Sequence, residues 1–241
     1  MAIQTQTIDY THDNITMKGF LAVDDATQNK RPGILVCHEW WGLNDYIGNR
    51  AKQLAQLGYV AFALDMYGNG QTAKDHNEAG KLMNALMTNP QAMGRVQAAV
   101  AVLKKDPHCD GNKLAAIGYC MGGAMALQMP FAGIPLKGVA SFHAVLSPAT
   151  PKDPKPIDAL TKIIVFTGAD DPMATHDQVG AFIDAMRKSN ADYQVIIYGN
   201  TRHAFTNPDA DKKGLPPLKY DANADQRSWT ALQNFLAEVF Q

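Results

Sequence analysis

A cysteine flanked by glycines is the strongest chemical signal in this sequence. It stands in the run Gly118-Tyr119-Cys120-Met121-Gly122-Gly123, after the apolar β-rich segment Leu114–Ile117 and before an Ala-rich segment of helical period. A strand, a sharp turn and a helix in this order form the context in which a nucleophile elbow presents its side chain. Small residues two positions before and after the nucleophile avoid collisions on such a turn, and Gly118 and Gly122 occupy those positions. We therefore expect Cys120 to be a nucleophile.

The helix expected after Cys120 would assist this residue in two ways. Its unpaired N–H groups and positive dipole favour a thiolate over a thiol. The backbone N–H of Met121 would also be placed to donate to a developing oxyanion. The motif by itself is equally compatible with a tight turn around a small buried cysteine. Its interpretation therefore depends on whether the chain supplies partners for the thiol.

A thiol nucleophile needs a base, and the base needs an acceptor that holds its tautomer. The apolar run Lys162–Thr167 is followed by two acids, and the run Tyr193–Tyr198 is followed by a loop that carries His203. The order Cys, Asp, His is that of α/β-hydrolases. Of the two acids we choose Asp171, three residues after Gly168, and expect Asp170 to serve as a turn or cap. The alternative for His203 is a loop histidine that faces solvent.

The segment Cys37-His38-Glu39-Trp40-Trp41-Gly42 follows the first long apolar run, where this fold places its second oxyanion donor. The backbone N–H of Trp40 is the candidate donor. His38-Glu39 matches the start of the zinc motif His-Glu-x-x-His, but Gly42 stands where the second His is required, so no metal is expected. At least one of the two tryptophans is expected to wall an apolar pocket, the alternative being core or interface aromatics.

Glu39 suggests a switch. If its carboxylate reached Cys120 in the resting enzyme, like-charge repulsion would oppose the thiolate until substrate intervened. The alternative is a surface ion pair with an arginine such as Arg202. His143 follows a strand that reaches Phe142 and is expected near the pocket. The candidate pocket residues are Trp41, Tyr67, His143 and Phe205.

Short apolar runs that alternate with segments of helical period must position these residues. Continuous rather than alternating hydrophobicity marks strands buried on both faces of a mainly parallel sheet. Such runs occupy Gly33–Cys37, Tyr59–Leu64, Lys113–Ile117, Lys137–Phe142, Lys162–Thr167 and Tyr193–Tyr198. The helical segments are Ile47–Gly58, Met93–Leu103, Ala124–Met129, Val179–Met186 and Trp229–Phe240. We predict an α/β fold with a doubly wound sheet, helices on both faces and functional groups at the carboxyl ends of the strands.

Other segments frame this core. Ile3–Tyr10 and Thr16–Val23 are expected to form an antiparallel pair before the parallel strands. Asn69–Asn89 is expected to be a loop followed by a helix over the site, and Ser147–Pro156 an exposed connection.

Length and composition limit the class of protein. The chain has 241 residues, of which 46% are hydrophobic, and we expect one α/β domain over residues 1–241. The net charge of −1 and the absence of a basic run argue against nucleic acid and anionic membranes as partners. We expect no secretory signal, and no apolar stretch reaches the roughly 20 residues that span a bilayer. Three cysteines without a C-x-x-C pair suggest reduced thiols and a cytoplasmic enzyme. We expect a small-molecule substrate, no cofactor, and a monomer or small homo-oligomer.

Five motifs together resemble the dienelactone hydrolase family, and the resemblance runs from about Thr16 to the end of the chain. The motifs are His38–Gly42, Asp65-Met66-Tyr67, Gly118–Gly123, Gly168–Asp171 and His203-Ala204-Phe205. The resemblance implies a triad of Cys120, His203 and Asp171. It also implies that Glu39 binds the resting thiol and moves away when substrate binds.

The sequence departs from the family where a substrate carboxylate would bind. In the family's archetype, carboxymethylenebutenolidase, arginines near the Asp-x-Tyr loop and just after the catalytic His hold that carboxylate. Here Tyr67-Gly68-Asn69 and His203–Asn207 contain no arginine, and Arg95 or Arg202 would have to substitute. The leading hypothesis is a cysteine hydrolase of a small ester or lactone that forms a thioacyl-enzyme. The alternative is a non-catalytic protein of α/β-hydrolase fold that binds a small ligand or senses redox state through Cys120.

Overall fold

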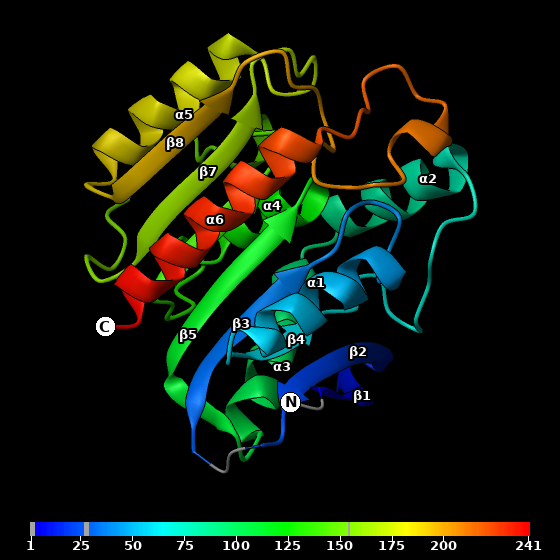
Figure 1. Ribbon diagram of the computed structural model, residues 1–241, viewed down its shortest axis with the longest axis vertical. Helices are drawn as coiled ribbons and strands as arrows, with labels where there is room; N and C mark the ends of the chain where they lie inside the picture. The colour runs from blue at the N-terminus through cyan, green and yellow to red at the C-terminus, as the bar shows by residue number, and fades with distance from the viewer. Residues whose placement is uncertain (1–2, 27–28, 154) are drawn as a thin grey trace. The chain divides into compact units, whose positions relative to one another are not determined.

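Strands and helices alternate along the chain, as the apolar pattern predicts. The computed structural model describes residues 3–26, 29–153 and 155–241. These residues contribute eight strands to one mainly parallel sheet (Figure 1). By its internal contacts the chain divides into two compact units, Met1–Ala116 and Ile117–Gln241. The mainly parallel α/β sheet with helices is confirmed, whereas the single domain over 1–241 stays a prediction.

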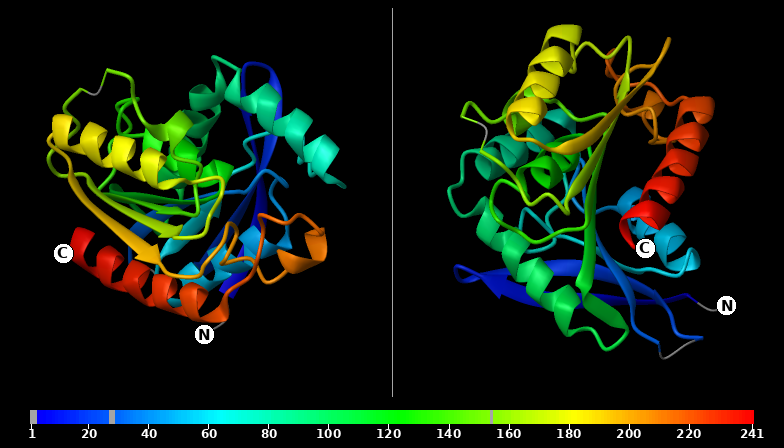
Figure 2. Two further views of the ribbon diagram at one scale, coloured as in Figure 1. Left: turned by 90° about the horizontal axis from the view of Figure 1, so that it is seen from above. Right: turned by 90° about the vertical axis from the view of Figure 1, so that its left-hand side faces the viewer.

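The first unit carries the expected antiparallel pair and the first parallel strands. Its strands lie in the order β1 (Ile3–His12), β2 (Ile15–Asp24), β4 (Val60–Ala63) and β3 (Arg31–Cys37). β1 and β2 are antiparallel, which confirms the predicted pair, and β3 and β4 are parallel, as a mainly parallel sheet requires. Helices α1 (Asp45–Gln56) and α3 (Ala92–Lys105) cover opposite faces of these strands, and α2 (His76–Met87) lies between them in the chain (Figure 2).

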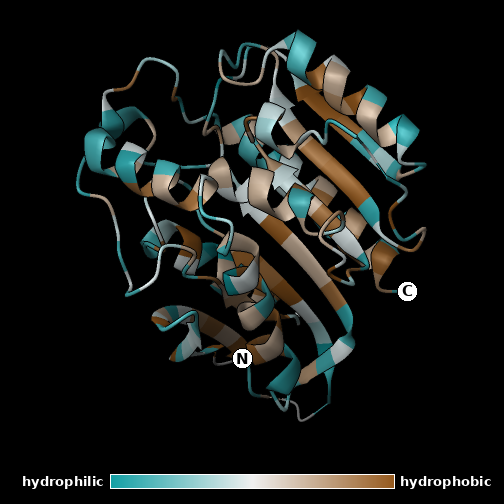
Figure 3. Ribbon diagram, turned by 180° about the vertical axis from the view of Figure 1, so that it is seen from behind, coloured by the Kyte–Doolittle hydropathy of each residue, from teal (hydrophilic) through white to brown (hydrophobic). Residues whose placement is uncertain are grey.

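The second unit continues from β5 (Cys109–Tyr119), which runs across the boundary between the units. The chain then forms α4 (Met121–Gln128), β6 (Gly138–Phe142), η1 (Ser147–Ala149), β7 (Lys162–Gly168), α5 (His176–Lys188), β8 (Asp192–Tyr198), η2 (Asp211–Lys213) and α6 (Ala222–Val239). α6 lies on one face of β6, β7 and β8, and α4 and α5 lie on the other (Figure 2). β6 and β7 are largely hydrophobic and almost entirely buried, because both of their faces are covered (Figure 3). β8 stands at the end of the strand order and has no buried residue, so the burial predicted for the run Tyr193–Tyr198 is wrong.

The register of the parallel strands brings the loops after them to one edge. Phe142, the last residue of β6, pairs with Phe166, and Gly168, the last of β7, pairs with Tyr198, the last of β8. Groups that follow the ends of parallel strands collect at this edge. The segments that carry His143, Asp171 and His203 therefore start side by side.

Some boundaries differ from the sequence prediction. α4 begins at Met121 rather than Ala124, and α6 begins at Ala222 rather than Trp229. The first turns of α6 are polar and show no apolar period, but the Asp221 side chain accepts a hydrogen bond from the Ala224 N–H and starts the helix there. The expected connection after β6 contains η1, and Pro154 within it lies outside the described residues. In the part of the chain that the structure describes, no helix is both long and apolar enough to cross a membrane.

Candidate active site

Cys120 joins β5 to α4 through a strained turn. Its backbone has φ 54° and ψ −119°, and its N–H donates to the carbonyl of Phe142 at 2.9 Å. A Cβ at Gly118 would lie 2.1 Å from the carbonyl oxygen of Gly122, so only glycine permits this close approach. The turn therefore has the geometry that the motif predicts. α4 starts at the very next residue, which places the thiol at the helix N-terminus.

Unusual backbone torsions mark the same region. Among the described non-glycine residues with positive φ, five are Asn or Asp, which tolerate this conformation. The others are Cys120 (φ 54°), His143 (φ 40°) and Ala204 (φ 58°). These three follow β5, β6 and β8. Backbone strain of this kind concentrates at functional sites, where surrounding contacts maintain it.

Asp171 and His203 form a buried pair. The Nδ1 atom of His203 lies 2.8 Å from Oδ2 of Asp171, and the two side chains are 1% and 0% exposed. The other oxygen of Asp171, Oδ1, accepts the N–H of Met173 at 2.8 Å. Asp170, the rival acid, is exposed. The structure therefore brings His203 to Asp171, and the carboxylate fixes the ring with Nδ1 as the donor.

Gly168 allows the two loops to meet. A Cβ at this position would lie 2.1 Å from the carbonyl oxygen of Thr201, two residues before His203. The same carbonyl accepts the N–H of Asp170 at 3.0 Å. The loop after β7 and the loop after β8 are thus in backbone contact. Sequence reasoning used Gly168 only as a marker of the turn and missed this function, since its cause is a contact 33 positions along the chain.

The electrostatics of His203 place its ring close to Cys120. Burial by itself disfavours a charged imidazole, but negative charge on Cys120 and the Asp171 carboxylate outweigh burial and raise the pKa of His203 to about 10. Nε2 makes no hydrogen bond of standard geometry among the described residues. Cys120 nevertheless acts on the ring through its charge and through a side-chain hydrogen bond, so the thiol lies close to the imidazole.

The other two cysteines lack this environment. Burial raises the pKa of the Cys37 thiol and of the Cys109 thiol to about 12. Both side chains therefore remain protonated and unreactive at neutral pH. Neither is bonded in a disulfide.

The predicted pocket residues His143 and Phe205 are fully buried around His203. The His143 ring lies 5.3 Å from the His203 ring and 5.2 Å from the Phe205 ring. Its Nε2 atom lies 2.7 Å from the hydroxyl of Thr206. Phe205 also packs against Tyr198. Both side chains support the histidine loop, and Thr206 is a residue for which the sequence carries no signal.

His38 is a structural histidine of the first unit. Its Nδ1 donates to the Glu39 carbonyl at 2.6 Å, and its Nε2 accepts the N–H of Met66 at 3.2 Å. Burial lowers the pKa of His38 to about 4, so the ring is neutral. No His, Cys, Asp and Glu cluster suited to a metal occurs within the described ranges.

The remaining predicted residues also lie in the first unit, directly after β3 and β4. Glu39 is 2% exposed, and Trp41 and Tyr67 are each 5% exposed. The Tyr67 hydroxyl donates to the Trp40 carbonyl at 2.8 Å, and the two tryptophan rings pack edge to face at 5.1 Å. The roles assigned to Glu39, Trp40, Trp41 and Tyr67 stay predictions.

The two candidate arginines are engaged with backbone carbonyls. Buried Arg95 donates from one nitrogen to the carbonyls of Met66 and Tyr67 at 2.8 and 2.7 Å. Exposed Arg202 donates to the carbonyl of Pro216 at 3.2 Å. Arg95 therefore shapes the loop after β4, a structural role that the sequence did not reveal.

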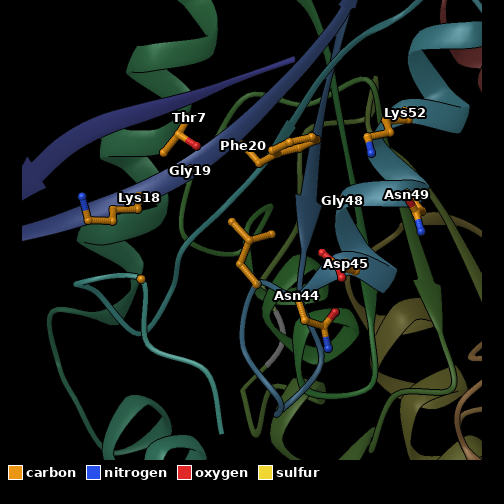
Figure 4. Close-up of a pocket in the computed structure, with 11 residues that line it drawn as sticks. Thr7, Lys18, Gly19, Phe20, Asn44, Asp45, Gly48, Asn49 and Lys52 are labelled. Carbon is orange, nitrogen blue, oxygen red and sulfur yellow. The ribbon is translucent and has the colours of Figure 1, made fainter. Parts of the chain in front are cut away.

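A separate hollow of about 310 Å³ lies in the first unit, between β1, β2 and α1 (Figure 4). Lys18, Phe20 and Lys52 are among its lining residues. None of the residues predicted to do chemistry lines it.

Comparison with protein families and curated proteins gives a consistent result. The model of the dienelactone hydrolase family matches residues 17–240. An uncharacterised protein from Caenorhabditis elegans is 38% identical over 159 residues, which cover 63% of this chain and 96% of the relative. A putative carboxymethylenebutenolidase from Aquifex aeolicus is 26% identical over 242 residues, covering 95% of this chain and 96% of the relative.

Solved structures share the whole architecture. A dienelactone hydrolase-like promiscuous phosphotriesterase from metagenomic libraries has a TM-score of 0.94 and 37% identity, with both chains covered completely. A putative dienelactone hydrolase from Klebsiella pneumoniae has a TM-score of 0.83 at 21% identity, covering 98% of this chain and 99% of the other, which shows the shared fold alone.

Proposed function

Because this chain belongs to the dienelactone hydrolase family, we propose that it hydrolyses a small ester or lactone through a thioacyl intermediate on Cys120. The observation that carries the proposal is the 2.8 Å hydrogen bond between Asp171 and His203. The charge of Cys120 also raises the pKa of the His203 ring. A thiol at a helix N-terminus supplies the nucleophile, and a buried imidazole held by a carboxylate supplies the base and acid.

Acylation begins with a thiolate at Cys120. Its sulfur attacks the carbonyl carbon, a C–S bond forms, and the carbonyl π electrons move to the oxygen. The N–H of Met121, at the start of α4, is proposed to stabilise that oxyanion. When the intermediate collapses, the C–O bond breaks and His203 gives its Nε2 proton to the leaving alkoxide. In a lactone the leaving oxygen stays attached to the acyl group.

Deacylation reverses the roles of the same groups. Neutral His203 takes a proton from water, and the hydroxide oxygen attacks the thioester carbon. The C–S bond then breaks, and the Cys120 thiolate leaves beside an imidazolium. Asp171 accepts the Nδ1–H throughout and keeps the ring oriented. No cofactor takes part in this scheme.

The first-unit residues complete the proposal on the strength of the family resemblance. The Trp40 N–H is the proposed second oxyanion donor, and Glu39 the proposed acid that restrains the thiol before substrate arrives. Trp41 and Tyr67 are the proposed pocket walls. His143 and Phe205, also predicted at the pocket, pack around the catalytic base.

We propose further that the preferred substrate is uncharged. The stretches where the archetype has its carboxylate-binding arginines contain none, and Arg95 and Arg202 both donate to backbone carbonyls. Without a bidentate guanidinium clamp, a substrate carboxylate would lose its solvation without compensation. Neutral lactones should therefore be turned over with a higher kcat/KM than anionic ones.

A neutral phosphotriester is a second candidate substrate. A promiscuous phosphotriesterase of dienelactone hydrolase-like structure shares 37% identity and a TM-score of 0.94 with this chain. A triester carries no negative charge, so it meets the same electrostatic requirement as a neutral lactone. An aryl phosphotriester belongs in the substrate panel for this reason.

The test compares two cysteine variants. Cys120→Ala should abolish turnover of p-nitrophenyl acetate and of a neutral lactone, while Cys109→Ala, which removes an unreactive thiol, should retain it. Mass spectrometry after a short ester pulse should find an acyl group on Cys120. Undiminished turnover by Cys120→Ala would eliminate the proposed nucleophile. Oxidised Cys120 without any acyl adduct would instead favour the non-catalytic redox sensor or ligand-binding protein.

A further inference from the structure

We propose that His143 is a positioning residue that holds the imidazole of His203 in place for reaction with Cys120. The inference rests on the proposed function. His143 is a fully buried titratable side chain that the acyl-transfer scheme does not use. It lies directly after the last residue of β6, at the edge of the sheet where the three triad segments meet.

The backbone around His143 connects two of those segments. The carbonyl of Phe142 accepts the N–H of Cys120 at 2.9 Å, and the N–H of His143 donates to the carbonyl of Phe166 at 2.8 Å. Phe166 lies in β7, whose end leads to Asp171. The end of β6 is therefore bonded to the nucleophile on one side and to the strand of the acid on the other.

The side chain of His143 connects the third segment. Its Nε2 lies 2.7 Å from the Thr206 hydroxyl, and Thr206 stands three residues after His203. The ring also contacts those of His203 at 5.3 Å and Phe205 at 5.2 Å, both nearly edge to face. One side chain thus contacts three of the four residues from His203 to Thr206.

Strain supports a positioning role. His143 and Ala204 both have positive φ, at 40° and 58°. They stand on the two segments that the ring and hydroxyl contacts join. A backbone held away from its favoured torsions relaxes when the contacts that maintain it are removed. Loss of the His143 contacts should therefore let the 203–206 segment move.

Other bonds hold this segment from different directions. Asp171 binds Nδ1 of His203, the N–H of Lys219 donates to the His203 carbonyl at 3.0 Å, and the N–H of Asp221 donates to the Phe205 carbonyl at 3.1 Å. These bonds fix the backbone and one ring nitrogen. The contact with His143 restrains the tilt of the ring and thereby the direction of Nε2. A shift of about 1 Å at a reacting group is enough to cost about 100-fold in rate.

The experiment removes each side of the His143–Thr206 contact. His143→Phe keeps an aromatic ring without the hydrogen bond, Thr206→Val removes the hydroxyl, and Thr206→Ser restores it. Thr161→Val is the matched control, because Thr161 is an equally buried threonine whose hydroxyl donates to the Leu136 carbonyl. Two readouts are used: steady-state ester hydrolysis per titrated active site, and the rate of Cys120 alkylation by iodoacetamide as a function of pH.

We expect His143→Phe and Thr206→Val to lower kcat per active site by about 10- to 100-fold with little change in KM. Both should also shift the pH dependence of alkylation, because the imidazolium no longer stands correctly beside the thiolate. The double variant should be no worse than the worse single one, since both remove one contact. Thr206→Ser should recover most of the activity, and Thr161→Val should change neither readout.

The proposal is overturned if Thr206→Val behaves like Thr161→Val, with the wild-type pH dependence. If His143→Phe fails to fold, the comparison of Thr206→Val with Thr206→Ser still tests the proposal, because only the serine variant keeps the hydroxyl that contacts His143. Failure of the proposed function looks different: Cys120→Ala would then still hydrolyse the ester. In that event alkylation still reports the geometry of the thiol and imidazole.

Discussion

Replacing Gly168 by alanine should inactivate the enzyme by separating two loops. The added Cβ would lie 2.1 Å from the carbonyl oxygen of Thr201, whereas ordinary contacts start at 3.4 Å. The carbonyl must therefore retreat by about 1.3 Å, the difference between these two distances. Thr201 precedes His203 by two residues, and its carbonyl is held by the N–H of Asp170. The movement carries His203 away from Asp171.

The size of the effect follows from that displacement. A shift of about 1 Å in a reacting group costs about 100-fold in rate, so we expect kcat to fall by at least this factor. Forcing a methyl group into a packed site costs about 1 to 3 kcal/mol of folding free energy. For a chain of this length each kcal/mol lowers Tm by about 2 to 4 °C. The variant should therefore fold at room temperature but work poorly.

Gly199→Ala is the matched control for this substitution. Gly199 lies in the loop after β8, has no positive φ, and an added Cβ there would meet nothing within 4 Å. The assay is kcat for p-nitrophenyl acetate per titrated active site, together with Tm for both variants. If Gly168→Ala keeps the activity and Tm of Gly199→Ala, the contact between these loops does not hold the histidine, and the reasoning is refuted.

Three further outcomes test the electrostatics. Asp171→Asn should lower kcat by about 10³- to 10⁴-fold, because the amide no longer stabilises the imidazolium. Asp170→Asn, at an exposed position, should leave kcat unchanged. Equal effects of the two substitutions would contradict the choice of Asp171 as the acid. Cys120→Ala should lower the pKa of His203 from its value of about 10, because the negative charge that raises it is gone, and NMR titration of the ring measures this. In the folded protein the pKa of His38 is about 4, below its ordinary value of 6.5. Between these two pH values the unfolded state binds more protons than the folded state. The free energy of unfolding should therefore fall by up to about 3 kcal/mol as the pH drops from 6.5 to 4. Urea midpoints across that range should lose part of this dependence in His38→Gln, and an unchanged slope would mean that His38 is not responsible.

Local patterns along the chain predict the fold class, which the structure confirms, and single out Cys120, Asp171 and His203 as candidate site residues. The apolar runs predict strands buried on both faces, because successive residues of such a strand point to opposite faces and must all be hydrophobic. Gly118 and Gly122 predict the turn at Cys120, since close backbone approach in a tight turn excludes larger side chains. Asp171 and His203 come after strands, and parallel strands bring the residues beyond their carboxyl ends to one edge of the sheet.

Contacts between distant segments were decided only by the tertiary structure. Spacing predicts Asp171 rather than Asp170 as the acid, and only the direction of the loop shows that Asp171 lies against His203 while Asp170 is exposed. No periodic pattern in the sequence predicts three of the contacts. These are the close approach of Gly168 to Thr201, the contact of the Thr206 hydroxyl with His143, and the hydrogen bonds from Arg95 to backbone carbonyls. Sequence spacing reports torsions and burial within a few residues, whereas these contacts depend on strand register and on the paths of loops between strands. Strand ends therefore predict which residues collect at the edge of the sheet, and packing in three dimensions decides which of their atoms meet.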